Sequence, residues 1–188
     1  LSIDGFGDFV STMWGLGKGY QIKVDDYVGF PHSLGLLYSA ITQYLGFWRY
    51  GDEYKIMGMA AYGKPTMKKE IGKLVKAVTG GKFELNTDYF LHHSEGVSME
   101  FQGGYPEIGR TFSEKLVELL GPARKSSEKV TQLHKDIACS VQYVYEEILF
   151  HILRHLNMIY PDIHNLCLSG GCAQNSLANG KITSNTQF

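Results

Sequence analysis

Residues 165–175 read Asn-Leu-Cys-Leu-Ser-Gly-Gly-Cys-Ala-Gln-Asn and are followed by Ser-Leu-Ala-Asn-Gly-Lys. This stretch predicts a short apolar strand, a turn of two glycines and a helix that opens with polar residues. Glycine has no Cβ, so a ligand can approach this backbone closely, and the free N–H groups at a helix start suit phosphate. A tight turn that needs glycine only for packing would give the same pattern. The turn therefore predicts a nucleotide or phosphate site at Gly170 and Gly171, with the amide of Asn175 one helical turn further on.

Composition narrows the class of protein. The chain has 188 residues, enough for one large domain or two small ones, with 44% hydrophobic and 20% charged residues. A net charge of −1 argues against a broad basic surface for nucleic acid, although a local patch stays open. No apolar run reaches the length of a membrane span. We predict no nucleic-acid partner and no membrane partner.

Cysteine usage and the chain ends add two expectations. The three cysteines form an odd set without paired spacing, which favours reduced, buried thiols in a cytoplasmic protein. Cys172 lies at a predicted helix start, where a thiol can be acidified, but no residue is assigned as its base. The chain opens inside a strand-like pattern without an initiator Met. We therefore expect a piece of a longer protein.

Hydrophobic periodicity predicts the order of the elements. A hairpin joins residues 1–3 to residues 9–14, and a third strand covers residues 20–24. The other predicted elements are a helix from 33 to 45, a loop from 51 to 65, a helix from 67 to 78, short strands at 83–85 and 90–92, an irregular segment at 94–109, and helices at 113–120 and 128–159. The class is α/β.

Three further groups of residues carry candidate chemistry. Asp4, at the end of the first strand, could hold a metal or its bound water, although Asp-Gly is also an ordinary hairpin turn. Lys55, in the predicted loop, could place a charge on a phosphate or lie on a solvated surface. His151 and His155 share a helix face at a spacing that suits zinc, but no third ligand is evident, which favours a structural role.

Six blocks of sequence, taken in order, resemble one known family. They are residues 2–8 (Ser-Ile-Asp-Gly-Phe-Gly-Asp), 31–38 (Pro-His-Ser-Leu-Gly-Leu-Leu-Tyr), 53–63 (Glu-Tyr-Lys-Ile-Met-Gly-Met-Ala-Ala-Tyr-Gly), 136–142 (Asp-Ile-Ala-Cys-Ser-Val-Gln), 166–175 and 179–181. Each block is weak alone, but their order is specific. The chain resembles the O-carbamoyltransferases of the NodU and CmcH type, along its whole length.

The resemblance implies a fold and a reaction. The fold would be a fragment of an actin-like, Hsp70-like two-lobed ATPase with helical insertions. Residues 1–188 would be an internal part of the N-terminal domain, with residues 1–63 from the first lobe, 64–127 an insertion and 128–188 from the second lobe. ATP and carbamoyl phosphate would give a carbamoyl-adenylate, and the carbamoyl group would pass to a hydroxyl of a small molecule or a sugar.

The resemblance also implies roles for single residues. Asp4 would ligate a divalent metal, expected to be iron, whose other ligands lie outside this chain. Gly170, Gly171 and Asn175 would contact ATP. Apart from the resemblance, Lys55 is the candidate catalytic residue because of its place in the glycine-bordered loop. The fragment alone is expected to be inactive. A threonylcarbamoyl transferase acting on transfer RNA and a non-catalytic actin-like nucleotide-binding module stay open, as do the acceptor and the oligomeric state.

Overall fold

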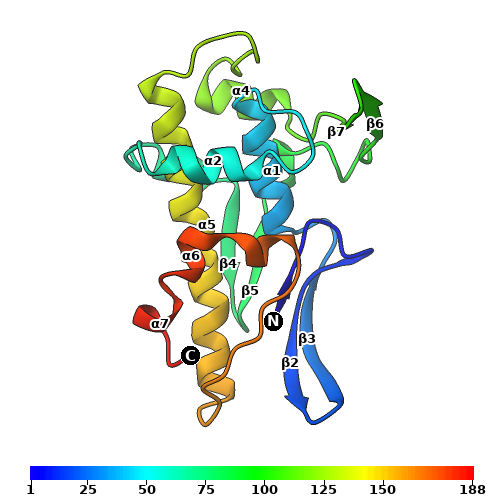
Figure 1. Ribbon diagram of the computed structural model, residues 1–188, viewed down its shortest axis with the longest axis vertical. Helices are drawn as coiled ribbons and strands as arrows, with labels where there is room; N and C mark the ends of the chain where they lie inside the picture. The colour runs from blue at the N-terminus through cyan, green and yellow to red at the C-terminus, as the bar shows by residue number, and fades with distance from the viewer. The chain divides into compact units, whose positions relative to one another are not determined.

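A computed structural model describes residues 1–188, except for the side chain of Gln102. The chain is mixed α/β and divides into two units that interleave along the sequence (Figure 1). Unit 1 comprises Leu1–Leu36, Lys76–Leu85 and Glu146–Phe188, and unit 2 comprises Leu37–Val75 and Asn86–Tyr145. Unit 1 thus takes residues from both segments expected to belong to different lobes, and the lobe assignment itself stays a prediction.

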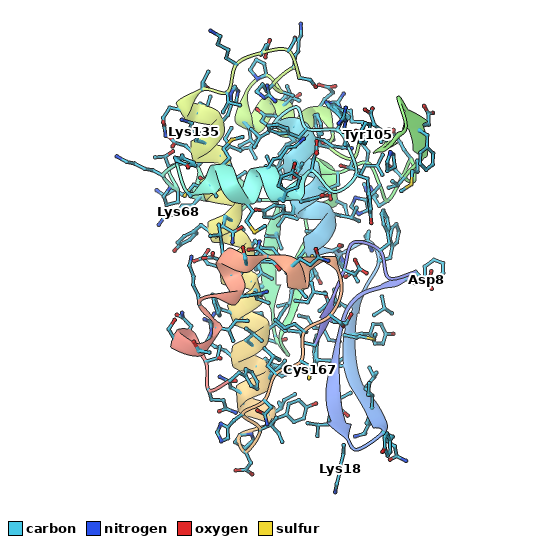
Figure 2. All side chains as sticks on the ribbon, in the orientation of Figure 1. Asp8, Lys18, Lys68, Tyr105, Lys135 and Cys167 are labelled. Carbon is cyan, nitrogen blue, oxygen red and sulfur yellow. The ribbon has the colours of Figure 1, made fainter. Side chains whose placement is uncertain are left out.

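The sheet of unit 1 confirms the predicted hairpin and third strand. Strands β1 (Ser2–Ile3), β2 (Val10–Lys18) and β3 (Gln21–Gly29) pair antiparallel in that order. Figure 2 labels Asp8 and Lys18, which lie near opposite ends of β2. Register pairs Ile3 with Thr12 and Thr12 with Val28, so these side chains share the buried face.

The rest of unit 1 packs around this sheet's buried face and one long helix. It contains most of β4 (Val75–Val78), β5 (Lys82–Leu85), the second part of α5 (Gln132–Ile159), and the short helices η2 (Gly171–Gln174), α6 (Ser176–Asn179) and α7 (Ile182–Asn185). Its buried apolar side chains include Ile3, Trp14, Val28, Phe83, Leu85, Ile148, Ile152, Leu153 and Leu156. The helical spacing of the last four explains why the sequence already predicted α5.

Unit 2 is largely helical. It contains α1 (Leu34–Tyr44) from Leu37 onward, α2 (Glu53–Ala60), α3 (Lys68–Ile71), η1 (Thr87–Tyr89), β6 (Met99–Gln102), β7 (Tyr105–Ile108), α4 (Glu114–Leu120) and the first part of α5. Its buried apolar side chains include Leu37, Ile41, Tyr44, Leu45, Ile56, Ile71, Leu74, Phe90, Phe112, Leu116, Ile137 and Val141. Buried Gln43 satisfies both ends of its amide, accepting from the Thr111 backbone N–H and donating to the Ile108 carbonyl.

Several predicted elements differ from the structure. The predicted loop at 51–65 contains α2, and the predicted helix at 67–78 is the short α3 followed by strand β4. The segment at 94–109, predicted to be irregular, holds the β6–β7 hairpin. Residues 90–92 form only an isolated bridge between Phe90 and Phe112. The predicted helices α1, α4 and α5 are confirmed, with α5 beginning at Gln132 rather than at residue 128.

Two expectations about single side chains are also settled. Cys167 is exposed and the other two cysteines are half-buried, so the predicted burial of the thiols is wrong. His151 and His155 have structural contacts: His151 Nε2 lies 2.8 Å from the Val78 carbonyl oxygen, and His155 packs edge-on against Trp14. No helix in the described part of the chain is long and apolar enough to cross a bilayer.

Candidate functional site

The end of β1 and the glycine turn lie side by side in unit 1. Residues 167–169 run parallel to β1: the Ile3 N–H donates to the Ser169 carbonyl at 2.9 Å, and the Ser169 N–H donates to the Leu1 carbonyl at 3.1 Å. The two extended segments therefore end at the same edge, one in Asp4 and the other in Gly170. In open α/β sheets, ligands bind outside the carboxyl ends of parallel strands, which makes this edge the candidate site.

The backbone at Gly170 admits no other residue. Its φ of 86° and ψ of 166° lie in a region that is essentially restricted to glycine. A Cβ on Gly170 would also lie 2.1 Å from the Ile3 carbonyl oxygen. Gly171 has an ordinary φ, and a Cβ there would lie 3.3 Å from Asp4 Oδ1. Gly170 is thus required for packing against β1, and this packing is what brings the turn to Asp4.

Asp4 is an exposed carboxylate held at this edge by backbone donors. Its Oδ1 accepts the N–H of Gly5 at 2.8 Å and, more weakly, the N–H of Gly171 at 3.3 Å. Both bonds fall on one oxygen, and no described residue donates a hydrogen bond to Oδ2. The turn therefore presents a negative charge with one oxygen directed to solvent or to a ligand.

The start of α1 also holds the backbone of Asp4. The Ser33 hydroxyl donates to the Asp4 carbonyl at 3.0 Å and accepts the Leu36 N–H at 3.1 Å, which caps the helix. Gly35 allows close approach, because a Cβ there would lie 2.7 Å from the Gly5 Cα. The sequence predicted a helix that begins at residue 33 but gave no signal that Ser33 supports Asp4, since the two residues are distant in the chain.

Next to this support, His32 is held neutral by its surroundings. Its Nδ1 accepts the Leu85 N–H at 3.1 Å, which requires an unprotonated ring nitrogen. Burial lowers the pKa of His32, the Glu84 carboxylate opposes that shift, and the Lys76 ammonium adds to it. His32, which precedes Ser33, is therefore held as a neutral ring by its burial and its contact with Leu85.

Asn175 has a different place from the one predicted. The glycine turn leads into η2, and Asn175 ends η2 and caps the next helix, α6, with its Oδ1 accepting the Ala178 N–H at 3.1 Å. The residue is 8% exposed. The prediction that Asn175 lies one turn into a single helix is wrong, because two short helices replace that helix.

Lys55 belongs to unit 2, on α2 rather than in a loop. Its ammonium pairs with the Asp52 carboxylate at 2.6 Å and lies 5.4 Å from the centre of the Phe47 ring. The structure therefore brings together Asp4, Gly170 and Gly171 in unit 1, while Lys55 stands in the other compact unit with a carboxylate partner of its own.

The donor set at the edge offers one metal ligand. No group of three or more His, Cys, Asp or Glu side chains among the described residues is arranged to hold a metal ion. The exposed Asp4 carboxylate fits as one oxygen ligand, which hard divalent cations and iron accept.

Comparison with known proteins gives the family. The sequence pattern described as carbamoyltransferase N-terminus matches residues 1–188. The chain is 38% identical to the uncharacterised protein sll1178 of Synechocystis sp., over 100% of this chain and 29% of that protein. It is 34% identical to the nodulation protein NolNO of Sinorhizobium fredii, over 97% of this chain and 23% of that protein. For the nodulation protein NolO of Bradyrhizobium diazoefficiens the identity is 33%, over 97% of this chain and 29% of that protein.

The match is continuous along this chain, and the chain spans less than a third of the length of these relatives. The resemblance predicted from the ordered blocks is therefore confirmed. The chain belongs to the family of the carbamoyltransferase N-terminus.

Proposed function

We propose that this chain forms part of an ATP-dependent O-carbamoyltransferase. ATP, carbamoyl phosphate and water would yield a carbamoyl-adenylate with release of pyrophosphate from ATP and of phosphate from carbamoyl phosphate. A hydroxyl of a small molecule or a sugar would then accept the carbamoyl group and release AMP. The observation that carries the proposal is the meeting of Asp4 with the Gly170–Gly171 turn at one sheet edge, in a chain of this family.

The edge suits a nucleotide with a cation. A carboxylate at a phosphate site repels the ligand unless a positive charge lies between them. A divalent ion on Asp4 would supply that charge and would polarise a phosphoryl oxygen. The Gly171 N–H, which is only weakly engaged by Asp4 at 3.3 Å, is the backbone donor nearest to such a ligand. We propose iron as the ion.

Topology supports the fold that we propose, a two-lobed actin-like ATPase. In unit 1, β1 lies between antiparallel β2 and the parallel segment 167–169. The chain passes from β1 to segment 167–169 through long helical connections, including α5, as the parallel pairing of these two segments requires. Ligand loops then follow the carboxyl ends of neighbouring parallel segments, where Asp4 and Gly170 stand. We place the protein in the cytoplasm, where ATP is available.

The proposal is tested by binding. Full-length protein with Asp4→Ala should lose most of its bound metal, measured by elemental analysis, and should bind ATP more weakly in equilibrium dialysis with Fe²⁺ under argon. The matched control is Asp8→Asn, which removes an exposed carboxylate from the same turn and suits the φ of 58° at that position. Equal metal content in the Asp4→Ala variant and the wild type would contradict the assignment. ATP binding without any chemistry would favour a non-catalytic nucleotide-binding module.

A further inference from the structure

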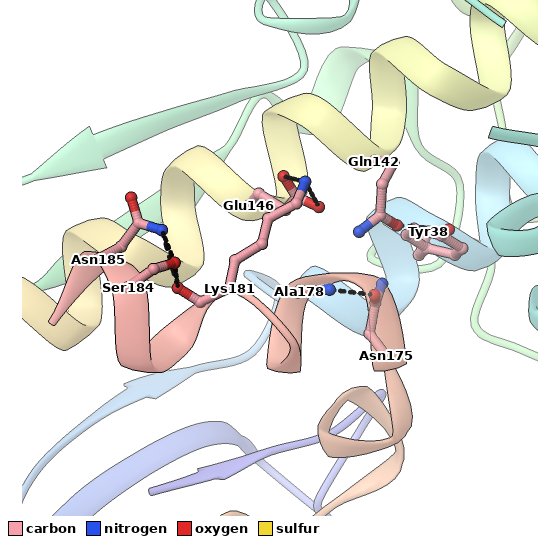
Figure 3. A network of polar contacts seen from close by, with 8 residues as sticks. All are labelled: Tyr38, Gln142, Glu146, Asn175, Ala178, Lys181, Ser184 and Asn185. Carbon is pink, nitrogen blue, oxygen red and sulfur yellow. Dashed lines mark hydrogen bonds and ion pairs between the residues drawn. The ribbon is translucent and has the colours of Figure 1, made fainter. Parts of the chain in front are cut away.

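An ion pair fastens the segment after the glycine turn to α5 (Figure 3). The Lys181 ammonium donates to both carboxylate oxygens of Glu146, at 2.8 Å to Oε1 and 2.6 Å to Oε2. Glu146 is 8% exposed, so its charge has been largely removed from water. Desolvation of a carboxylate is costly, and bidentate contact with a cation offsets that cost. The bond with Lys181 therefore helps to stabilise Glu146 in its buried place.

The segment joined to α5 by this pair has little stability of its own. The helices η2, α6 and α7 have four residues each. Helices this short do not persist alone in water, because nucleation costs more than a single turn returns. Their position must come from contacts with the rest of unit 1.

Local hydrogen bonds link η2 and α6, the part between the turn and Lys181. Asn175 caps Ala178, and the Asn179 side-chain amide donates to the Ala173 carbonyl at 2.6 Å, which ties α6 back to η2. At one end, Gly170 is seated against the Ile3 carbonyl of β1. At the other end, Lys181 is held by Glu146 on α5. The turn is thus anchored from both sides.

We infer that Glu146 and Lys181 are a positioning pair that sets the Gly170–Gly171 turn for nucleotide phosphate. The inference rests on the proposed function, since it assigns a role to the pair in binding ATP at that turn. Without the pair, α6 and η2 keep their local bonds but lose a fixed end. The Gly171 N–H then samples several positions. ATP binding must fix it in one of them, and the entropic cost of doing so lowers the affinity for ATP.

The test compares ATP affinity with stability in the full-length protein. Lys181→Met should weaken ATP binding about 10-fold in equilibrium dialysis with Fe²⁺. Lys181→Arg should bind within about 2-fold of the wild type, because the guanidinium fork suits a carboxylate. Lys82→Met is the matched control, since it removes a 2.8 Å ion pair with Asp26 elsewhere in unit 1 and should leave the affinity unchanged.

The outcomes separate the inference from the function on which it rests. If the wild type does not bind ATP, the proposed function and the inference both fall. If the wild type binds ATP and Lys181→Met binds it equally well, the inference alone is wrong, whatever the variant does to the melting temperature. Should Lys181→Met fail to fold, Glu146→Gln decides, because glutamine keeps the shape and one hydrogen bond while it removes the charge.

Discussion

Replacing Gly170 with alanine tests whether the glycine turn is fixed by its contact with β1. Alanine at a φ of 86° and ψ of 166° carries strain of about 1–3 kcal/mol. The added Cβ would also meet the Ile3 carbonyl oxygen at 2.1 Å, and that oxygen belongs to the backbone and cannot swing aside. The parallel pairing of residues 167–169 with β1 must then open. We expect a total loss of about 3–5 kcal/mol from the free energy of unfolding.

The assay can use a probe placed in unit 1, because the chain has two tryptophans and they fall in different units. Trp14 is buried in unit 1, while Trp48 belongs to unit 2. In a Trp48→Phe background, the fluorescence of Trp14 during urea unfolding reports unit 1, and the linear extrapolation gives the free energy of unfolding.

Substitutions at two other glycines of unit 1 separate the cost of a positive φ from the cost of a steric clash with β1. Gly19 has a φ of 59°, and a Cβ added there would meet no atom within 4 Å, so Gly19→Ala should cost about 1–2 kcal/mol. Gly17, on β2, has neither feature, so Gly17→Ala should stay within about 0.5 kcal/mol of the parent. If Gly170→Ala cost no more than Gly19→Ala, the account of the turn as a backbone contact with β1 would be refuted.

Two further predictions concern the support of Asp4. Burial lowers the pKa of His32 in the folded protein, so at acidic pH the unfolded chain binds more protons than the folded one. The contribution of His32 to the free energy of unfolding is therefore full above about pH 6.5 and is lost as the pH falls toward the folded pKa. Between pH 7.5 and 5.5, His32→Asn, which keeps an acceptor for Leu85, should lose less stability than the wild type; equal losses would contradict this. Ser33→Ala removes the cap of α1 and the bond to the Asp4 carbonyl, and should cost about 1–2 kcal/mol in the Trp14 assay, whereas Ser33→Thr should retain most of that stability.

Long amphipathic elements could be predicted from the sequence because their apolar residues repeat at one period. α5 repeats its buried residues over 28 positions, and α1 has a capping serine before it and Gly46 after it. Short elements lack that repetition. In α2, only Ile56 and Ala60 are buried, and glycines on both sides favoured a loop. Tertiary burial of Ile56, which no local pattern reveals, decided the outcome.

The β6–β7 hairpin had a local signal that the glycine-rich composition around it obscured. Gly103 and Gly104 both have positive φ and form a two-residue turn between the paired Gln102 and Tyr105. A Gly-Gly dipeptide between two short strands is a typical hairpin turn. The glycine-rich composition of residues 94–109 suggested irregular structure instead, because Gly96 and Gly109 extend the pattern beyond the turn.

The candidate site was predictable in its parts but not in its support. Asp4 and the Gly170–Gly171 turn were each identified from their positions after strand-like segments. Their adjacency depends on parallel pairing across more than 160 residues, as the Gly171–Asp4 contact spans 167 positions. Asn175 was misplaced because one helix was expected where two short helices meet. Nothing local indicated that break.

The most direct measurement of the central claim is formation of the adenylate by full-length protein supplied with ATP, carbamoyl phosphate and Fe²⁺. Mass spectrometry should detect carbamoyl-adenylate, together with released pyrophosphate, for the wild type and for the Asp8→Asn control. Asp4→Asn, which keeps the shape of the turn and removes its charge, should lower both products by at least about 10-fold, a loss of roughly 1.4 kcal/mol or more of transition-state stabilisation. Absence of adenylate and pyrophosphate with the wild type, or equal yields from Asp4→Asn, would contradict the account.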